Sequence, residues 1–387
     1  MGYIKRKAAK IGAKLRRFAY APRITHPAFV HPLIGVEAPA LERLHGGPPP
    51  DDALLERIAA AYRKARPLNT SATPSMWDEH AAARARLAAA LEASDLADLR
   101  GQFVDLFGGC LLDGMSHGNR MFADEALNPY SRGFVGLRTL DCLHSLAEAT
   151  GARPIPSFAQ HGLIAYVALL NQDPGRLLAE VQEALGFPLD MPAAGAPYVC
   201  RLGGVATAPD VLRHAYIAHR LTQLGLGPEA RVLEVGGGFG MAALCARRAG
   251  IGRFTIIDLP FVGAIQMAYL GGVLGAAEVS ALGEAEAPVR LLPPDAIADL
   301  PDDSFDIVIN CDSLPEMGRE TAAGYIRQFR RLAPRFLSVN QEAQKVHGGL
   351  AQNLVPALVE AAGGFRRLHR FRYWMEQGYV EELYERR

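Results

Sequence analysis

The stretch Arg231-Val-Leu-Glu234-Val-Gly236-Gly-Gly238-Phe-Gly240 decides the fold of this chain. Its apolar run stops at a cluster of glycines and resumes as Met241-Ala-Ala-Leu-Cys-Ala, which predicts a buried strand, a tight turn and a helix start. Glycines allow backbone conformations that other residues avoid, and they let a ligand approach closely. Asp258 then ends a second predicted strand at the spacing of a ribose-binding acid. The pattern indicates a nucleotide-binding turn.

Two kinds of nucleotide cofactor fit such a turn. Gly238, Gly240 and Ala243 also satisfy the loose dinucleotide pattern, whereas a P-loop is excluded because no Lys-Ser or Lys-Thr follows. Glu234 favours S-adenosylmethionine over NAD, since a carboxylate there can serve a cationic amino-acid moiety but would repel a pyrophosphate. The segment Ser304 to Met317 agrees, because it places polar groups at the carboxyl end of a strand.

Further motifs lie between Leu233 and the C-terminus. They are Leu-Glu-Val-Gly-Gly-Gly-Phe-Gly, Ile-Asp-Leu-Pro ending at Pro260, Asn310-Cys-Asp-Ser-Leu-Pro-Glu-Met, Ser338-Val-Asn-Gln-Glu342, and Arg372-Tyr-Trp-Met-Glu-Gln-Gly-Tyr-Val-Glu-Glu382. Together they resemble the bacterial sugar O-methyltransferases, a family of class I S-adenosylmethionine-dependent enzymes. The resemblance covers the chain from about Arg213 onward. It implies methylation of a sugar hydroxyl in cell-surface polysaccharides or glycosylated metabolites, without identifying the sugar.

We therefore expect an α/β fold: a Rossmann-like class I methyltransferase doubly wound sheet with an additional, mostly α-helical N-terminal domain. The expected domains are a basic helix with a Pro-rich linker at 1–50, a helical acceptor or lid domain at 51–197, and the methyltransferase domain at 198–387. Helices are predicted at 52–65, 76–93, 96–110, 137–149, 158–170, 174–185 and 208–224. Strands are predicted at 232–235, 255–258, 289–292, 305–310, 336–340, 365–372 and, supplied by the resemblance, 378–383.

Composition excludes several classes of protein. The 387 residues include 41 basic and 41 acidic side chains, so no net charge argues for a nucleic-acid partner. Five scattered cysteines without a Cys-x-x-Cys pair suit a reducing cytoplasm and give no zinc site. The uncharged stretch from Leu259 to Ala277 is predicted to be a buried helix rather than a membrane span. A homo-oligomer is compatible with this composition.

Residues 1–20 hold seven basic side chains and no acid, with apolar residues at helical spacing. One hypothesis is that this basic amphipathic helix lies on the anionic inner face of the membrane. The alternative is a solvated or domain-packed terminal helix.

The cofactor is expected to lie beyond the carboxyl ends of the strands. A helix before the glycine turn normally passes over the cofactor in this fold, so two of its polar side chains are predicted to contact the methionine carboxylate. The third strand is followed by an acid that either lies near the adenine or caps a short helix. The predicted cofactor contacts are Glu234, Gly236, Gly238, Asp258, Leu259, Asp295, Asn310, Tyr216 and Arg220.

A sugar hydroxyl is weakly acidic, so it needs a general base or a divalent cation. The candidate catalytic residues are His347, Glu342, Asp312 and Glu316. Each has a structural alternative: Asp312 as a helix cap, Glu316 as a partner of the helix dipole, and His347 as plain surface. Several aspartates are expected at one edge of the sheet, so dependence on a divalent metal stays an open alternative. No ligand spacing in the sequence is diagnostic of a metal site.

The acceptor is expected to meet polar loops of the helical half. The glycine-punctuated segment from Asp113 to Arg120 supplies donors and acceptors that suit a hydroxyl-rich molecule. The predicted substrate contacts are His117, Asn119, Arg120, His161 and Trp374, the last as an apolar face for a sugar ring. Two other functions stay open: methylation of a non-sugar oxygen or nitrogen, and a non-catalytic S-adenosylmethionine-binding subunit.

Overall fold

The computed structural model describes residues 37–70, 73–116, 133–157, 159, 160, 162, 164, 168 and 171–387. The predicted basic helix at 1–20 lies outside these residues, as do much of the predicted linker and much of the predicted helix at 158–170.

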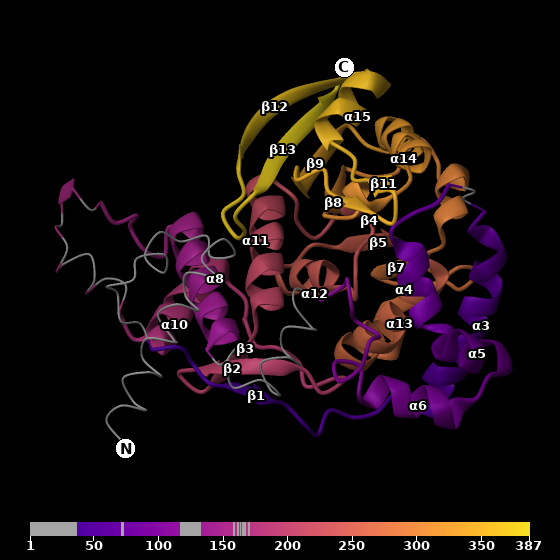
Figure 1. Ribbon diagram of the computed structural model, residues 1–387, viewed down its shortest axis with the longest axis horizontal. Helices are drawn as coiled ribbons and strands as arrows, with labels where there is room; N and C mark the ends of the chain where they lie inside the picture. Colours follow the sequence, from indigo (N-terminus) through magenta and orange to yellow (C-terminus); the bar gives the residue numbers. More distant parts are fainter. Residues whose placement is uncertain are drawn as a thin grey trace.

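An eight-stranded sheet forms the centre of the molecule, in the order β12-β13-β9-β8-β4-β5-β7-β6 (Figure 1). Its strands are β4 (Arg231–Val235), β5 (Arg253–Ile257), β6 (Val279–Ala281), β7 (Val289–Leu292), β8 (Ile307–Cys311), β9 (Arg335–Gln341), β12 (Phe365–Arg372) and β13 (Tyr379–Arg386). All neighbours are parallel except the terminal hairpin, in which β13 pairs antiparallel with both β9 and β12.

The strand order reverses at β4, which has the parallel strands β5 on one side and β8 on the other. Open α/β sheets bind ligands at such a point, outside the carboxyl ends of the strands. The predicted fold class is confirmed: a Rossmann-like, doubly wound sheet with the arrangement expected of class I methyltransferases, preceded by a mostly helical region.

Each predicted strand is found, and the structure adds short strands that the sequence pattern did not reveal. A small sheet joins β1 (Leu41–Arg43), β2 (Tyr198–Leu202) and β3 (Val205–Thr207), and a hairpin joins β10 (Val346–His347) and β11 (Leu350–Ala351). β1 thus connects the end of the predicted linker to residues that begin the predicted methyltransferase domain.

The helices mostly begin and end near the predicted residues. They are α3 (Asp52–Ala65), α4 (Trp77–Ala83), α5 (Ala85–Ala93), α6 (Leu96–Val104), α8 (Phe134–Thr150), α10 (Pro174–Leu185), α11 (Pro209–Gln223), α12 (Met241–Arg248), α13 (Pro260–Leu274), α14 (Arg319–Leu332) and α15 (Val355–Ala362). Short 3₁₀ turns are η2 (Arg66–Leu68), η3 (Ala276–Glu278), η4 (Pro294–Asp299) and η5 (Leu314–Glu316). The helix predicted to reach residue 110 ends at Val104.

The prediction of one continuous helix over residues 76–93 was wrong, because the chain breaks at Arg84. This side chain is only 1% exposed and donates hydrogen bonds to the carbonyls of His80, Leu111 and Asp113. A buried guanidinium needs such acceptors. An alanine-rich pattern cannot reveal them, since Leu111 and Asp113 lie in a later segment.

One hydrophobic core joins the helical region to one face of the sheet. It contains Leu55 of α3, Leu143 of α8, Leu212 of α11 and Leu270 of α13. The uncharged stretch predicted as a buried helix is α13, which packs beside α3 (Figure 1). In the part of the chain that the structure describes, no helix is long and apolar enough to span a membrane. The three-domain division stays a prediction.

Candidate functional site

A cavity of about 310 Å³ opens where β4, β5 and β8 end. Pockets for small molecules usually measure roughly 300–1,000 Å³. Its floor comes from residues 234–239 and 257–259, and its sides come from residues 311–318, Arg213 and His214. The helical region supplies the remaining wall through residues between 69 and 81 and residues 114–116. The site is therefore built from both halves of the chain.

The glycine turn after β4 needs glycine at specific positions. Gly236 has φ +76°, and a Cβ there would collide with the Ser313 side chain. Gly238 has φ +56°, and a Cβ there would lie 3.2 Å from the carbonyl oxygen of Met115. Left-handed backbone and close neighbours together exclude larger side chains. The turn thus keeps its backbone at the cavity wall.

Glu234 is a buried carboxyl at the end of β4. It is 1% exposed, lines the cavity, and its Oε2 has no hydrogen-bond partner among the described residues. Burial, and to a smaller extent the nearby Asp258 carboxylate, raises the pKa of Glu234 to about 8. A cationic ligand group beside this carboxyl would stabilise its ionised form.

Asp258 follows β5 and is held in a fixed orientation. Its Oδ1 accepts a hydrogen bond from the Leu259 N–H at 2.8 Å, and its Oδ2 accepts one from Gln266 Nε2 at 2.9 Å. Gln266 also donates to the Gly238 carbonyl at 2.9 Å, so it joins the acid to the glycine turn. Burial raises the pKa of Asp258 to about 7 against the opposing effect of these hydrogen bonds.

Asp312 follows β8 in a left-handed conformation, with φ +62°. Such backbone is uncommon outside glycine and is often found at functional sites. The Tyr379 hydroxyl donates to Asp312 Oδ2, whereas the buried Oδ1 has no partner among the described residues. Burial, then the Glu316 carboxylate, raises the pKa of Asp312 to about 8. This is a carboxyl that can exchange a proton near neutral pH.

Glu316 lies one turn further on and also lines the cavity. Its Oε2 accepts a hydrogen bond from Trp77 Nε1 at 2.8 Å, and its backbone carbonyl accepts one from the Met76 N–H at 3.1 Å. Burial raises the pKa of Glu316, and the hydrogen bond from Trp77 acts in the opposite direction. Glu316 therefore connects the sheet to the helical wall.

The structure brings seven of the thirteen predicted cofactor and catalytic residues to the cavity and leaves the other six, together with the predicted substrate contact Trp374, outside it. The predicted residues that line it are Glu234, Gly236, Gly238, Asp258, Leu259, Asp312 and Glu316. Those that do not are Asp295, Asn310, Tyr216, Arg220, His347, Glu342 and Trp374. The predicted contacts His117, Asn119, Arg120 and His161 lie outside the described residues.

Two of the predicted residues that lie outside the cavity make hydrogen bonds that hold neighbouring segments in place. Asn310 is fully buried and donates to the Val235 carbonyl at 2.8 Å, which joins the ends of β8 and β4. Asp295 accepts hydrogen bonds from Thr70 N–H at 3.0 Å and Thr70 Oγ1 at 2.7 Å. These side chains position loops rather than line the cavity.

Tyr216 and Arg220 lie on the expected helix, α11, but both bind Glu381 of β13. The Tyr216 hydroxyl donates at 2.6 Å and Arg220 Nε donates at 2.8 Å. The residue of this helix face that reaches the cavity is Arg213, which is ion-paired with Glu376 at 2.7 Å. Periodicity identified the face, but it does not indicate which turn of the helix meets the ligand.

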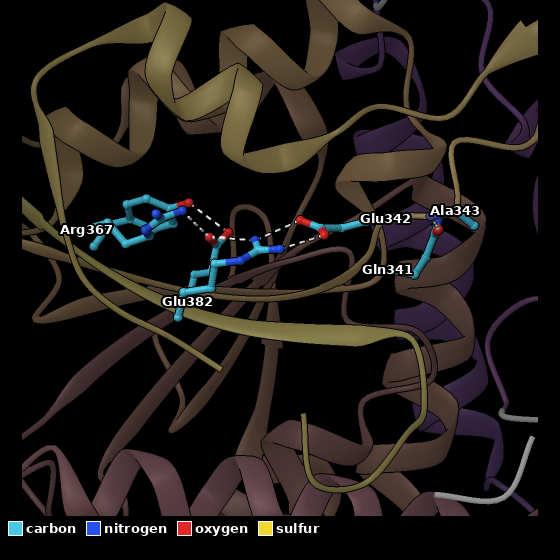
Figure 2. A network of polar contacts seen from close by, with 7 residues as sticks. Gln341, Glu342, Ala343, Arg367 and Glu382 are labelled. Atoms are coloured by element: carbon cyan, nitrogen blue, oxygen red, sulfur yellow. Dashed lines mark hydrogen bonds and ion pairs between the residues drawn. The ribbon is translucent and has the colours of Figure 1, made fainter. Parts of the chain in front are cut away.

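The two leading general-base candidates of the last loop lie away from the cavity. His347 is exposed on the β10–β11 hairpin. Glu342 accepts a bidentate ion pair from Arg370 at 2.7 and 2.8 Å, which lowers its pKa (Figure 2). Figure 2 shows this network continuing through Glu382 to Arg367. A carboxylate so paired is a poor proton acceptor. Trp374 packs against the core.

Sequence patterns identified the segment that begins at Asp113, of which residues 114–116 line the cavity, but they missed other cavity residues of the helical region, above all Trp77, Thr73 and Ser75. No motif marks them, because their role depends on contacts across the fold. Within the described residues, no group of three or more His, Cys, Asp or Glu side chains is arranged to hold a metal ion.

No family model and no curated protein matches the chain. Solved structures match the sheet domain at low identity. The [4+2]-cyclase SpnF matches at 20% identity and TM-score 0.35, over 44% of this chain and 80% of its own. Magnesium protoporphyrin IX methyltransferase from Synechocystis, with bound S-adenosylmethionine, matches at 17% and 0.34, over 45% and 78%. The 1,6-didemethyltoxoflavin-N1-methyltransferase of Burkholderia thailandensis matches at 20% and 0.32, over 45% and 76%.

Proposed function

We propose that this protein is an S-adenosylmethionine-dependent methyltransferase that methylates a hydroxyl of a sugar or glycosylated acceptor. The observation that supports it most strongly is Glu234: a buried carboxyl in the cavity beside the glycine turn, with one oxygen that no described residue contacts by a hydrogen bond. Such a group matches the ammonium of the methionine moiety and disfavours a pyrophosphate. Asp258, fixed by Gln266, is suited to accept hydrogen bonds from ribose hydroxyls.

When bound, S-adenosylmethionine supplies an electrophilic methyl group on a cationic sulfonium. The residues of the chain then have to orient the acceptor, exclude water and remove a proton. Asp312 is the general base in this proposal, because its Oδ1 has no partner among the residues that the structure describes and Tyr379 fixes its Oδ2. A carboxyl group accepts a proton only when it is ionised. Because the pKa of Asp312 is raised to about 8, the rate should rise as pH rises through that value.

A hydroxyl-rich acceptor fits the wall opposite the glycine turn. Thr73, Ser75 and Thr321 line it with hydroxyl groups, which can donate to and accept from sugar hydroxyls. The resemblance in the C-terminal half implies the same acceptor class. A contribution to the acceptor wall is also the role that we propose for the helical region, residues 51–197.

The decisive experiment combines cofactor titration with methyl transfer. We expect calorimetry to detect binding of S-adenosylmethionine and not NAD, and labelled methyl to appear on sugars or glycosylated metabolites of a small-molecule extract. Asp312→Asn should keep the cofactor affinity and lower kcat by about 10²–10⁴-fold, the usual contribution of a general base. Asp299→Asn, an exposed acid of η4 outside the cavity, is the control.

Binding of NAD alone would overturn the cofactor assignment. Full activity of Asp312→Asn would remove Asp312 as the base. Methyl transfer only to a non-sugar oxygen or nitrogen would support the methyltransferase assignment and contradict the assignment of a sugar acceptor.

A further inference from the structure

Trp77 is the first residue of α4 and lines the cavity on its helical side. Its indole is partly exposed, whereas most aromatic side chains of the chain are buried in the core. The sequence contains only two tryptophans, and Trp374 lies outside the cavity lining. A large aromatic face beside Asp312 and Glu316 calls for a ligand that has an apolar surface.

Several neighbours hold the Trp77 ring in place. Its Nε1–H donates to Glu316 Oε2 at 2.8 Å, and the His80 ring lies 4.9 Å away between centroids. The Arg84 guanidinium carbon lies 6.0 Å from the ring centroid, within reach of a cation–π contact. Gly114 has φ +82°, and a Cβ there would lie 3.5 Å from Trp77 Cη2. The ring is therefore fixed before any ligand binds.

We propose that Trp77 is the platform on which the acceptor ring lies, and that Glu316 is the positioning residue that holds this platform. A sugar ring presents an apolar face of C–H groups and a polar edge of hydroxyls, which matches an indole in a cavity that is also lined by Ser75, Thr73 and Asp312. Fixing the indole reduces the entropy lost when the acceptor binds and aims one hydroxyl at the base. Because Trp77 acts on the acceptor, this role rests on the function proposed above.

The assignment gives Glu316 a different task from Asp312. Glu316 Oε2 is engaged by the indole N–H, whereas Asp312 Oδ1 has no partner among the described residues. Glu316 thus acts through Trp77, and its loss should weaken acceptor binding more than it slows the chemical step. A general base would show the opposite behaviour.

The two-tryptophan composition permits a direct test. In the Trp374→Phe variant, Trp77 is the only indole and its fluorescence reports on the acceptor wall. With S-adenosylhomocysteine present, we expect saturable changes in emission on adding methyl glycosides of glucose, galactose, mannose or rhamnose. The matched control, Trp77→Phe, retains only Trp374 and should give no saturable change. No response from Trp77 to any of the four glycosides, or an equal response in the control, overturns the platform.

The positioning role is tested in the same single-tryptophan background. Glu316→Gln keeps an oxygen that accepts the indole N–H, so the glycoside affinity should stay close to that of the parent. Glu316→Leu removes the acceptor and should weaken glycoside binding by about tenfold, the effect of one lost hydrogen-bond partner. Equal affinities in the Gln and Leu variants would overturn the role of Glu316.

Calorimetric titration with S-adenosylhomocysteine separates the two proposals. Unchanged affinity in every variant shows that the fold and the cofactor half are intact. Failure of the parent protein to bind it would contradict the proposed function. Normal binding without a Trp77 response would contradict only the platform.

Discussion

At the scale of single residues, the cavity contains carboxyl groups whose pKa values depend on their burial and on their hydrogen-bond partners. Glu234 is buried and Asp258 and Asp312 are half-buried beside the cavity, and removal from water raises the pKa of each. Their differences come from hydrogen bonds: Asp258 is satisfied by Leu259 and Gln266, whereas Glu234 retains an unpartnered oxygen. Binding of a cationic cofactor would therefore change the ionisation of Glu234 more than that of the other carboxyl groups.

We predict that binding of S-adenosylmethionine releases protons at pH 7. Glu234, with a pKa of about 8, is mostly protonated in the free protein, and the cationic ligand selects its ionised form. Affinity should therefore rise with pH and level off above about 8. Calorimetry in buffers of different ionisation enthalpy counts the released protons. In Glu234→Gln, only the smaller release due to Asp258 should remain, and an unaltered release would exclude Glu234 from the effect.

At the scale of elements, local sequence patterns predicted the positions of strands better than the breaks within helices. β4 and β7 lie where alternation and turn residues place them, because a buried parallel strand is a short apolar run between polar segments. The break between α4 and α5 and the strand β6 were not predicted. The first depends on three carbonyls that accept from Arg84, and the second on pairing with β7.

The turn between β4 and α12 gives a prediction about backbone geometry. Gly236→Ala should lower the free energy of unfolding by about 1–3 kcal/mol, since alanine is strained at φ +76° and its Cβ meets Ser313. It should also abolish cofactor binding. Gly272→Ala is the control, because this exposed glycine of α13 has open space and should gain about 0.5–1 kcal/mol. Urea unfolding measures both, and equal effects would show that the turn tolerates a side chain.

At the scale of the whole molecule, the helical region and the sheet share a core and are joined by polar contacts. Arg57 of α3 donates to Glu284 at 2.9 and 3.0 Å, and to the carbonyls of Ala276 and Val279 at 2.9 and 3.0 Å. Trp77 makes an equivalent contact at the cavity with Glu316, and Thr70 makes one outside the cavity with Asp295. The acceptor wall therefore depends on this docking.

Arg57→Met should lower the free energy of unfolding by about 2–3 kcal/mol, because it leaves Glu284 and two carbonyls without their charged donor. Arg176→Met removes an exposed i,i+4 pair with Glu180 and should cost less than about 0.5 kcal/mol. Urea unfolding should show one cooperative transition for both variants. A separate transition of the helical region in the parent protein would mean that the two regions fold independently.

The sequence by itself determined the sheet, the glycine turn and the acids at the ends of β4 and β5, since each depends on residues that are close together in the chain. It also identified Asp312, but it could not separate Asp312 from His347 or Glu342 as a base. Only the tertiary structure places Asp312 in the cavity and His347 and Glu342 outside it, and only the tertiary structure brings Trp77 to the proposed acceptor wall. The contacts that define these placements join Trp77 to Glu316 and Asp312 to Tyr379, across sequence separations of 239 and 67 residues. Periodicity and spacing describe neighbours along the chain, whereas the first contact exists only once the helical region packs on the sheet and the second only once β8 and β13 lie in the same sheet.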